Sequence, residues 1–214
     1  MTNKLATSLL AAAVLLALAA PAVLAGDPDM LQDICVADYK SLKGPLRNVT
    51  ANDFFSNALA TPGNTGNALG SAVTSANVET LPGLNTLGVS VSRIDFAAWG
   101  VNPPHVHPRA TEVIFVLQGS LDVGFVTTAN RLYARTVCAG EVFVFPRGLV
   151  HYQKNNGGSP AAVLSAFDSQ LPGTQPVAEA LFGAAPPVPT DVLARSFQID
   201  GGLVEAIKSK FPPK

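Results

Sequence analysis

The segment NPPHVHPRATEVIFVLQG, residues 102–119, holds two of the chain's three histidines, one residue apart and between prolines. His105 and His107 occupy positions i and i+2, and such residues point to the same face of a strand. Glu112 begins the next apolar run and shares its face with Ile114, so we expect its carboxylate to point inward. Because a buried carboxylate needs a partner, these three side chains together indicate a cation site.

The third histidine, His151, follows the segment GEVFVFPRGLV, in which an apolar strand ends at the turn signal Pro-Arg-Gly. If that strand lies beside the first, all three imidazoles and Glu112 face one cavity. A single histidine in a strand is usually a packed or surface residue, but here every histidine falls in one of two strand–turn segments. Three imidazoles and a carboxylate form a mixed nitrogen and oxygen site that suits Mn, Fe, Zn, Cu or Ni. We therefore predict a metal site with coordination positions left open for water or substrate.

The elements that must position these ligands are short β-prone runs punctuated by Gly, Pro and Asn. They are TLGVSVSRIDF, EVIFVLQG, SLDVGFVTT, RLYARTV, GEVFVFP and AAVLSAF. Several short strands at this spacing predict an all-β barrel or sandwich. In the first run, Val89 and Val91 alternate and then give way to Ile94 and Phe96 in another register, which predicts a β-bulge.

Short helices are predicted on both sides of these strands. After them, PTDVLARSFQI has Thr190 as its expected N-cap, and GGLVEAIKSKF repeats the same amphipathic pattern. We expect the apolar stripes of both helices to pack on their own barrel or on another subunit. Before the strands, TANDFFSNAL predicts a short helix capped by Thr50 or Asn52.

Residues 1–25 have the layout of a secretory signal peptide. Lys4 precedes an apolar run, and small side chains stand before the expected cleavage point after Ala25. The apolar run of about 12 residues is shorter than the roughly 20 needed to span a bilayer, and we expect no membrane span later in the chain. The mature chain is then divided into an N-terminal arm, residues 26–60, and one domain, residues 61–214.

Three further residues could be modified or paired if the protein is secreted. Asn48 begins the tripeptide Asn-Val-Thr, an acceptor for N-glycosylation in a secreted protein. Cys35 and Cys138 are the only cysteines, and an even count in an oxidising compartment is compatible with a disulfide. Two unpaired thiols are equally compatible with their spacing.

The net charge is −1 at pH 7 with no basic patch, so nucleic acid is not an expected partner.

The two histidine segments resemble the two motifs of the cupin superfamily, and specifically those of the plant germins and germin-like proteins. WGVNPPHVHPRATEVIFVLQG corresponds to the first motif and GEVFVFPRGLVHYQKN to the second. The similarity also includes LQDICVADYKS, VTANDFF, LPGLNTLGVS and LVEAIKSKF. The resemblance implies a jelly-roll type cupin β-barrel with an N-terminal arm and short C-terminal helices.

The same resemblance implies a cofactor, an assembly and a location. One manganese ion would be bound by His105, His107, Glu112 and His151. The protein would be a homohexamer, built as a trimer of dimers, in which the C-terminal helices clasp neighbouring subunits. It would be an extracellular protein of the plant apoplast, where the cell wall is a further partner.

Three positions depart from the family pattern. Trp99 stands where the first motif usually has a glycine. The second N-terminal cysteine of the family is missing, so Cys35 has no family partner. Oxalate oxidases among the germins carry two asparagines near the metal; one is present here as Asn102, but Ser92 replaces the other. The replacement argues against oxalate as the substrate.

The leading hypothesis is a manganese enzyme acting on superoxide, with Asn102 placing a hydrogen-bond donor near a bound anion. The second nitrogen of each imidazole should be held by an acceptor that the sequence does not identify. One alternative is an oxalate oxidase, which would use the same metal to bind another small anion. The other is a non-catalytic extracellular binding, storage or receptor-like protein that keeps the metal for stability. Chelation should end turnover in an enzyme but only lower the stability of a binding protein.

Overall fold

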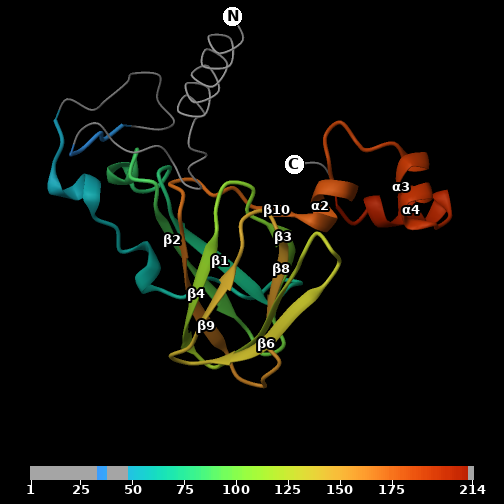
Figure 1. Cartoon of the computed structure of the whole chain (residues 1–214), viewed down its shortest axis with the longest axis horizontal. Helices are drawn as coiled ribbons and strands as arrows, with labels where there is room; N and C mark the ends of the chain where they lie inside the picture. The colour runs from blue at the N-terminus through green and yellow to red at the C-terminus, as the bar shows by residue number, and fades with distance from the viewer. Residues whose placement is uncertain (1–32, 38–47, 212–214) are drawn as a thin grey trace, which may run out of the picture.

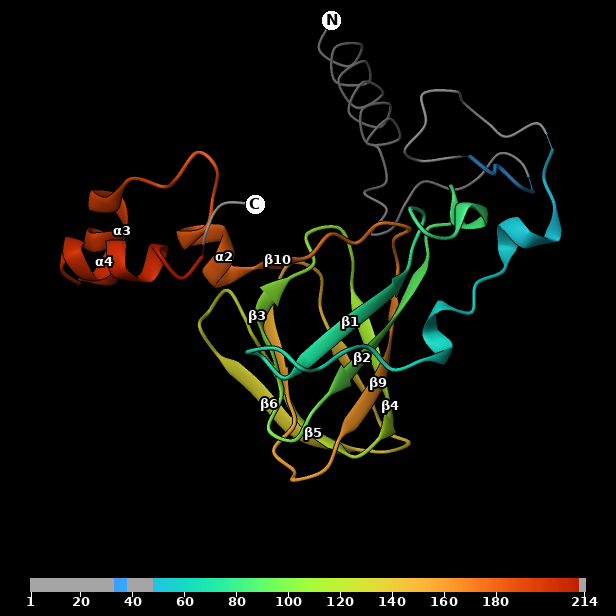
Figure 2. The ribbon, with the colours of Figure 1, turned by 180° about the vertical axis from the view of Figure 1, so that it is seen from behind.

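The computed structural model describes residues 33–37 and 48–211, so the predicted signal peptide, residues 1–25, and part of the arm lie outside the described residues. In the described part, the strands form two five-stranded sheets with the orders β1-β2-β9-β4-β7 and β10-β3-β8-β5-β6. The paired strands are antiparallel. The two sheets form a barrel, and the α-helices of the described residues lie at one side of it (Figures 1 and 2). This architecture confirms the predicted cupin β-barrel.

The strands and helices have the following bounds. The first sheet contains β1 (Ser71–Ala76), β2 (Ser90–Phe96), β9 (Ala161–Phe167), β4 (Glu112–Gln118) and β7 (Val142–Phe145). The second contains β10 (Gln175–Pro176), β3 (Val101–Val106), β8 (Val150–Lys154), β5 (Ser120–Val126) and β6 (Leu132–Cys138). The helices are η1 (Ala51–Phe54), η2 (Ala58–Ala60) and η3 (Pro82–Leu84), which are 3-10 helices, and α2 (Val177–Phe182), α3 (Thr190–Phe197) and α4 (Gly201–Lys208).

The core lies between the two sheets. On β4, Glu112, Ile114 and Val116 are buried while Val113 and Phe115 are exposed, as expected for side chains that alternate across a strand. The apolar residues that pack together inside the barrel are Ile94, Phe96, Ile114, Val116, Leu121, Val123, Val137, Phe145, Ala161 and Val163. This alternation turns Glu112 toward the interior, as the sequence predicted.

The bulge predicted in β2 is absent from the described strand. Each residue from Ser90 to Phe96 pairs in unbroken register with β1 or β9. The buried side of this strand begins with Ser90 and Ser92 and continues with Ile94, while Val89 precedes the strand and is exposed. The prediction was wrong because it assigned the inward positions to the valines, whereas two serines occupy them.

The C-terminal helices α3 and α4 confirm the two predicted helices, and α2 was not predicted. Helix α3 begins at Thr190, so Pro189 and not Thr190 is its N-cap. Asp200 caps α4, because its Oδ1 accepts a 2.7 Å hydrogen bond from the backbone N–H of Gly202. Helices α3 and α4 pack against each other beside the barrel (Figure 1).

Near the N-terminus, the predicted short helix is the 3-10 helix η1. Thr50 is its N-cap, and its backbone N–H donates to Asp53 Oδ2 at 2.7 Å. In the described segments no helix is long and apolar enough to cross a membrane.

The disulfide considered for Cys35 and Cys138 is not formed, and both described thiols are free. The two cysteines have different neighbours in the fold. The carbonyl of Cys35 accepts a hydrogen bond from Asn85 Nδ2 at 2.7 Å, near η3. Cys138 ends β6 and pairs with Ser120, beside the β4–β5 turn. Sequence spacing could not reveal this separation, because it depends on the course of the chain through the barrel.

Candidate metal centre

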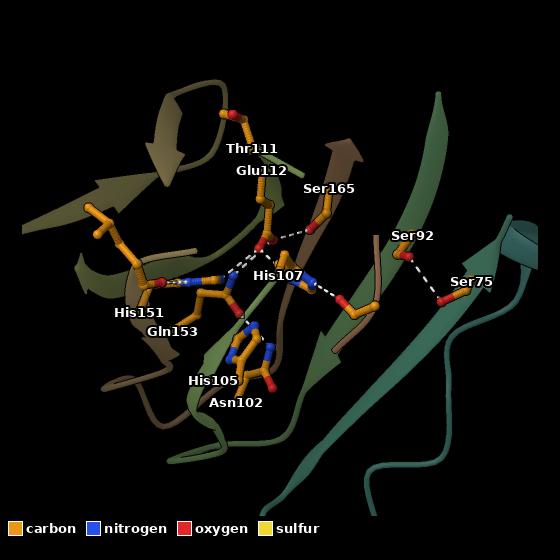
Figure 3. Close-up of polar contacts among 12 residues, drawn as sticks. Ser75, Ser92, Asn102, His105, His107, Thr111, Glu112, His151, Gln153 and Ser165 are labelled. Atoms are coloured by element: carbon orange, nitrogen blue, oxygen red, sulfur yellow. Dashed lines mark hydrogen bonds and ion pairs between the residues drawn. The ribbon is translucent and has the colours of Figure 1, made fainter. Parts of the chain in front are cut away.

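The four predicted ligand residues come together between the two sheets (Figure 3). Strands β3 and β8 place His105 directly opposite His151, and His107 follows β3 by one residue. Glu112 reaches them from β4 in the other sheet. All four side chains are buried, and their ligand atoms lie within 4.8 Å of one another. This group is the one metal-binding cluster of His, Cys, Asp or Glu in the described residues.

The ligand atoms of these residues point at one another. Oε2 of Glu112 lies 3.1 Å from Nε2 of His107 and 3.0 Å from Nε2 of His151. The ring centroids of His105 and His151 are 4.2 Å apart. Three imidazole nitrogens and one carboxylate oxygen therefore share one small space.

The outer nitrogen of each imidazole is held by the backbone. The acceptors are the carbonyl of Pro103 for His105 at 2.7 Å, that of Leu149 for His151 at 2.8 Å, and that of Gly173 for His107. A carbonyl only accepts, so Nδ1 of each ring carries the proton and donates it. Nε2 of each ring faces the cation site, and a bound cation would replace the contact that Nε2 of His151 makes with Glu112. These carbonyls are the acceptors that the sequence left unidentified.

The carboxylate of Glu112 has hydrogen-bond partners that were not predicted. Its Oε1 accepts from Gln153 Nε2 at 3.0 Å and from Ser165 Oγ at 2.8 Å, and both donors are fully buried. The amide oxygen of Gln153 in turn accepts from Asn102 Nδ2 at 2.6 Å. Asn102, expected to serve a bound anion, thus reaches Glu112 through Gln153. One signal was available, since Gln153 stands two residues after His151 and shares its face.

Burial sets the charges in the site. It lowers the pKa of His105 to about 4, and the nearby His151 adds to this effect. Burial alone would raise the pKa of Glu112, but hydrogen bonds from His107 and His151 outweigh it and lower that pKa below its usual range. At neutral pH His105 is therefore neutral and Glu112 is ionised, which are the states that metal binding requires.

The donor set fits a divalent transition metal. Imidazole suits Zn, Cu, Fe and Ni, and the single carboxylate adds a hard oxygen ligand of the kind that suits Mn. A cation would also balance the buried negative charge of Glu112. The four residues thus form a buried site of the kind that holds a metal ion.

A pocket of about 230 Å³ lies beside the site. His105, His107 and Glu112 form part of its wall, and Ser92 and Asn102 are also among its lining residues. The hydroxyl of Ser92 donates to that of Ser75 at 3.0 Å, on the side away from Glu112 (Figure 3). The described residues that line the pocket include no Lys or Arg. Trp99 does not line this pocket.

The fold and the site agree with the similarity of the chain to known proteins. The family model described as Cupin matches residues 57–205. Germin-like protein 1-3 of Oryza sativa subsp. japonica is 71% identical over 214 residues, which cover 95% of this chain and 96% of the relative. Germin-like protein subfamily 2 member 1 of Arabidopsis thaliana is 61% identical, with 88% and 89% covered. A solved structure of oxalate oxidase is 47% identical with a TM-score of 0.81, and covers 86% of this chain and 98% of its own. The chain therefore belongs to the cupin family and, within it, to the germin-like proteins.

Proposed function

We propose that this germin-like protein is a secreted manganese enzyme that dismutates superoxide. The observation that carries the proposal is the buried site of three histidines and one glutamate beside a small pocket. A dianion such as oxalate would find no lysine or arginine among the described lining residues, whereas a small oxygen species needs no such partner. Ser92 also argues against oxalate as the substrate, because oxalate oxidases among the germins carry asparagine at this position.

The residues of the chain have separate tasks in this proposal. The three Nε2 atoms and Oε2 of Glu112 would hold the manganese, which supplies two oxidation states and an open coordination position. The backbone carbonyls keep each imidazole in one tautomer and one orientation. The hydroxyl and amide groups of Ser92 and Asn102 give the pocket a polar wall from which water can deliver protons.

The first test is superoxide dismutation by the purified, manganese-loaded protein, with His107→Ala as its matched variant. We expect activity in the wild type and loss of both manganese and activity in the variant, because His107 supplies one of the four ligands. A wild type that holds manganese but does not dismutate superoxide would contradict the enzymatic proposal. Retention of metal and activity by His107→Ala would contradict the ligand set.

Oxalate oxidation is the second candidate, and the likeness to oxalate oxidase at 47% identity favours it. Its test is peroxide release from oxalate by the same preparation. The remaining alternative is a non-catalytic extracellular binding, storage or receptor-like protein. Removal of the metal by a chelator distinguishes this class, because it would lower thermal stability with no turnover to lose.

We further propose that residues 1–25 are removed and that residues 26–214 act in the apoplast, next to the cell wall. Asn48 is exposed, as a glycosylated residue must be, and we propose that it carries an N-linked glycan. The protein would assemble as a homohexamer, a trimer of dimers. Mass spectrometry of the secreted protein tests the cleavage point and the glycan together.

A further inference from the structure

Ser165 is a polar residue in the middle of an otherwise apolar buried row. Along β9 the other inward residues are Ala161, Val163 and Phe167, and all of them are buried. Ser165 itself has no exposed surface, and burying a hydroxyl is unfavourable unless it forms a hydrogen bond. Its partner is Glu112, toward which the side chain points (Figure 3).

The two oxygens of Glu112 have different surroundings. Oε1 accepts hydrogen bonds from Ser165 at 2.8 Å and from Gln153 at 3.0 Å. A carboxylate oxygen has about two lone-pair directions, so these two donors use the acceptor capacity of Oε1. Oε2 faces the Nε2 atoms of His107 and His151. The carboxylate is thus held with one oxygen toward the protein and the other toward the cation site.

We propose that Ser165 is a positioning residue that keeps Glu112 a one-oxygen ligand of the bound metal. The inference rests on the metal-binding part of the proposed function and does not depend on superoxide as the substrate. While Ser165 and Gln153 hold Oε1, only Oε2 is available to a cation. Without the hydroxyl, Oε1 keeps a single donor and the carboxylate can rotate to offer both oxygens. The second oxygen would then occupy a coordination position that substrate or water needs.

The decisive variant is Ser165→Ala in the full-length, manganese-loaded protein. Alanine removes one oxygen atom and keeps the rest of the side chain, so the barrel should fold. We expect a changed manganese(II) electron paramagnetic resonance spectrum and an affinity for manganese about tenfold weaker, measured by competition with a chelator. Ser165→Thr keeps a hydroxyl at the same position and should restore both quantities toward their wild-type values.

Ser90→Ala is the matched control. Ser90 is also a buried serine on an inward position of the same sheet, and its hydroxyl donates to the carbonyl of Ser169 at 2.7 Å. It has no hydrogen bond to any of the four metal-binding residues. The control should lose some thermal stability but keep the wild-type resonance spectrum and manganese affinity. A purely structural role of Ser165 would make the two alanine variants behave alike.

Two results would overturn the proposal. One is a wild-type spectrum and affinity in Ser165→Ala. The other is an equal change in Ser90→Ala, which would assign the effect to general weakening of the sheet. Neither readout requires turnover, so a wild type that binds manganese without dismutating superoxide would contradict the proposed activity and leave this test valid.

Discussion

The imidazole of His105 and the carboxylate of Glu112 make the site sensitive to acid. Burial lowers the pKa of His105 from 6.5 to about 4, so the unfolded chain takes up this proton before the folded chain does. The stability of the folded metal-free protein therefore falls as the pH drops from 6.5 toward 4. The lowered pKa of Glu112 acts in the same direction, because the stability that its ionised form contributes is lost as the carboxylate becomes protonated.

We therefore expect acid to release the metal and to destabilise the metal-free protein over the same pH range. Histidine must be neutral to bind a metal ion, so protons compete directly with manganese. The thermal unfolding midpoint of the metal-free protein and the manganese retained after dialysis are measured at steps between pH 7 and pH 4. His105→Gln removes one titrating group and should flatten the pH dependence. An unfolding midpoint that stays constant over this range would contradict the prediction.

Phe145 packs in the apolar core and also contacts the metal site. It is fully buried, and its ring stacks on His151 with centroids 4.5 Å apart and an interplanar angle of 23°. We expect Phe145→Ala to lower the free energy of unfolding by about 3–5 kcal/mol, because it removes a large buried side chain and leaves a cavity. Urea unfolding of the metal-free protein measures the loss. Phe145→Leu fills most of the space and should cost clearly less, and equal losses in the two variants would contradict this account.

At the scale of elements, the loop between β9 and β10 positions His107. The carbonyl of Gly173 holds the Nδ1 proton of His107, and the carbonyl of Leu171 accepts from Arg109 Nε at 2.7 Å. Gly173 has a φ of +69°, which side chains other than glycine rarely adopt. A Cβ at this position would lie 2.8 Å from Arg109 Nη2. The loop therefore depends on glycine for its backbone conformation, and a Cβ here would also displace the guanidinium of Arg109.

Gly173→Ala should weaken metal binding as well as stability. The positive φ alone costs an alanine about 1–2 kcal/mol, and a backbone adjustment that relieves this strain would move the carbonyl that holds His107. The measurements are the thermal midpoint and the manganese affinity. Gly140→Ala is the control, because Gly140 has a φ of +86° but nothing within 4 Å of its Cβ position. We expect the control to lose stability alone. A loss of manganese affinity as large in the control as in Gly173→Ala would contradict the role of this loop.

At the scale of the whole molecule, α3 and α4 extend beside the barrel and pack mainly on each other (Figure 2). Leu193 and Val204 are buried, but Val192, Phe197 and Leu203 are about half exposed. Exposed apolar side chains on such a helical pair are the kind of surface that a neighbouring subunit covers. This surface is consistent with the proposed homohexamer, in which the C-terminal helices would clasp other subunits.

The double variant Val192→Asp and Leu203→Asp should therefore reduce the size of the assembly. Two charges on this surface would be buried without partners in the hexamer, whereas the barrel and its metal site would remain intact. Light scattering after size-exclusion chromatography gives the mass, and bound manganese per chain reports on the barrel. Arg195→Ser, an exposed polar change on α3, is the control. A wild type that is monomeric in solution would contradict the proposed assembly.

The sequence by itself determined the features that depend on residue type and on the spacing of apolar side chains along a strand or helix. Side chains alternate along a strand within a few residues, so the inward direction of Glu112 and the shared face of His105 and His107 could be predicted from local spacing alone. The scarcity of histidine made the third member, His151, easy to assign. The all-β architecture and the two C-terminal helices were predicted for the same local reasons.

Tertiary structure decided which distant residues support those ligands. Ser165 and Gln153 bind Glu112 from 53 and 41 residues away along the chain. Gly173 binds His107 from 66 residues away. Such contacts depend on which strands are neighbours and on their register, and the local spacing of apolar residues predicts neither of these. The pairing of the two cysteines was left open by the sequence, and the serines on the inner face of β2 were mispredicted, for this reason. The ligands follow from short-range geometry, whereas the hydrogen bonds that orient them exist only once the two sheets have closed on each other.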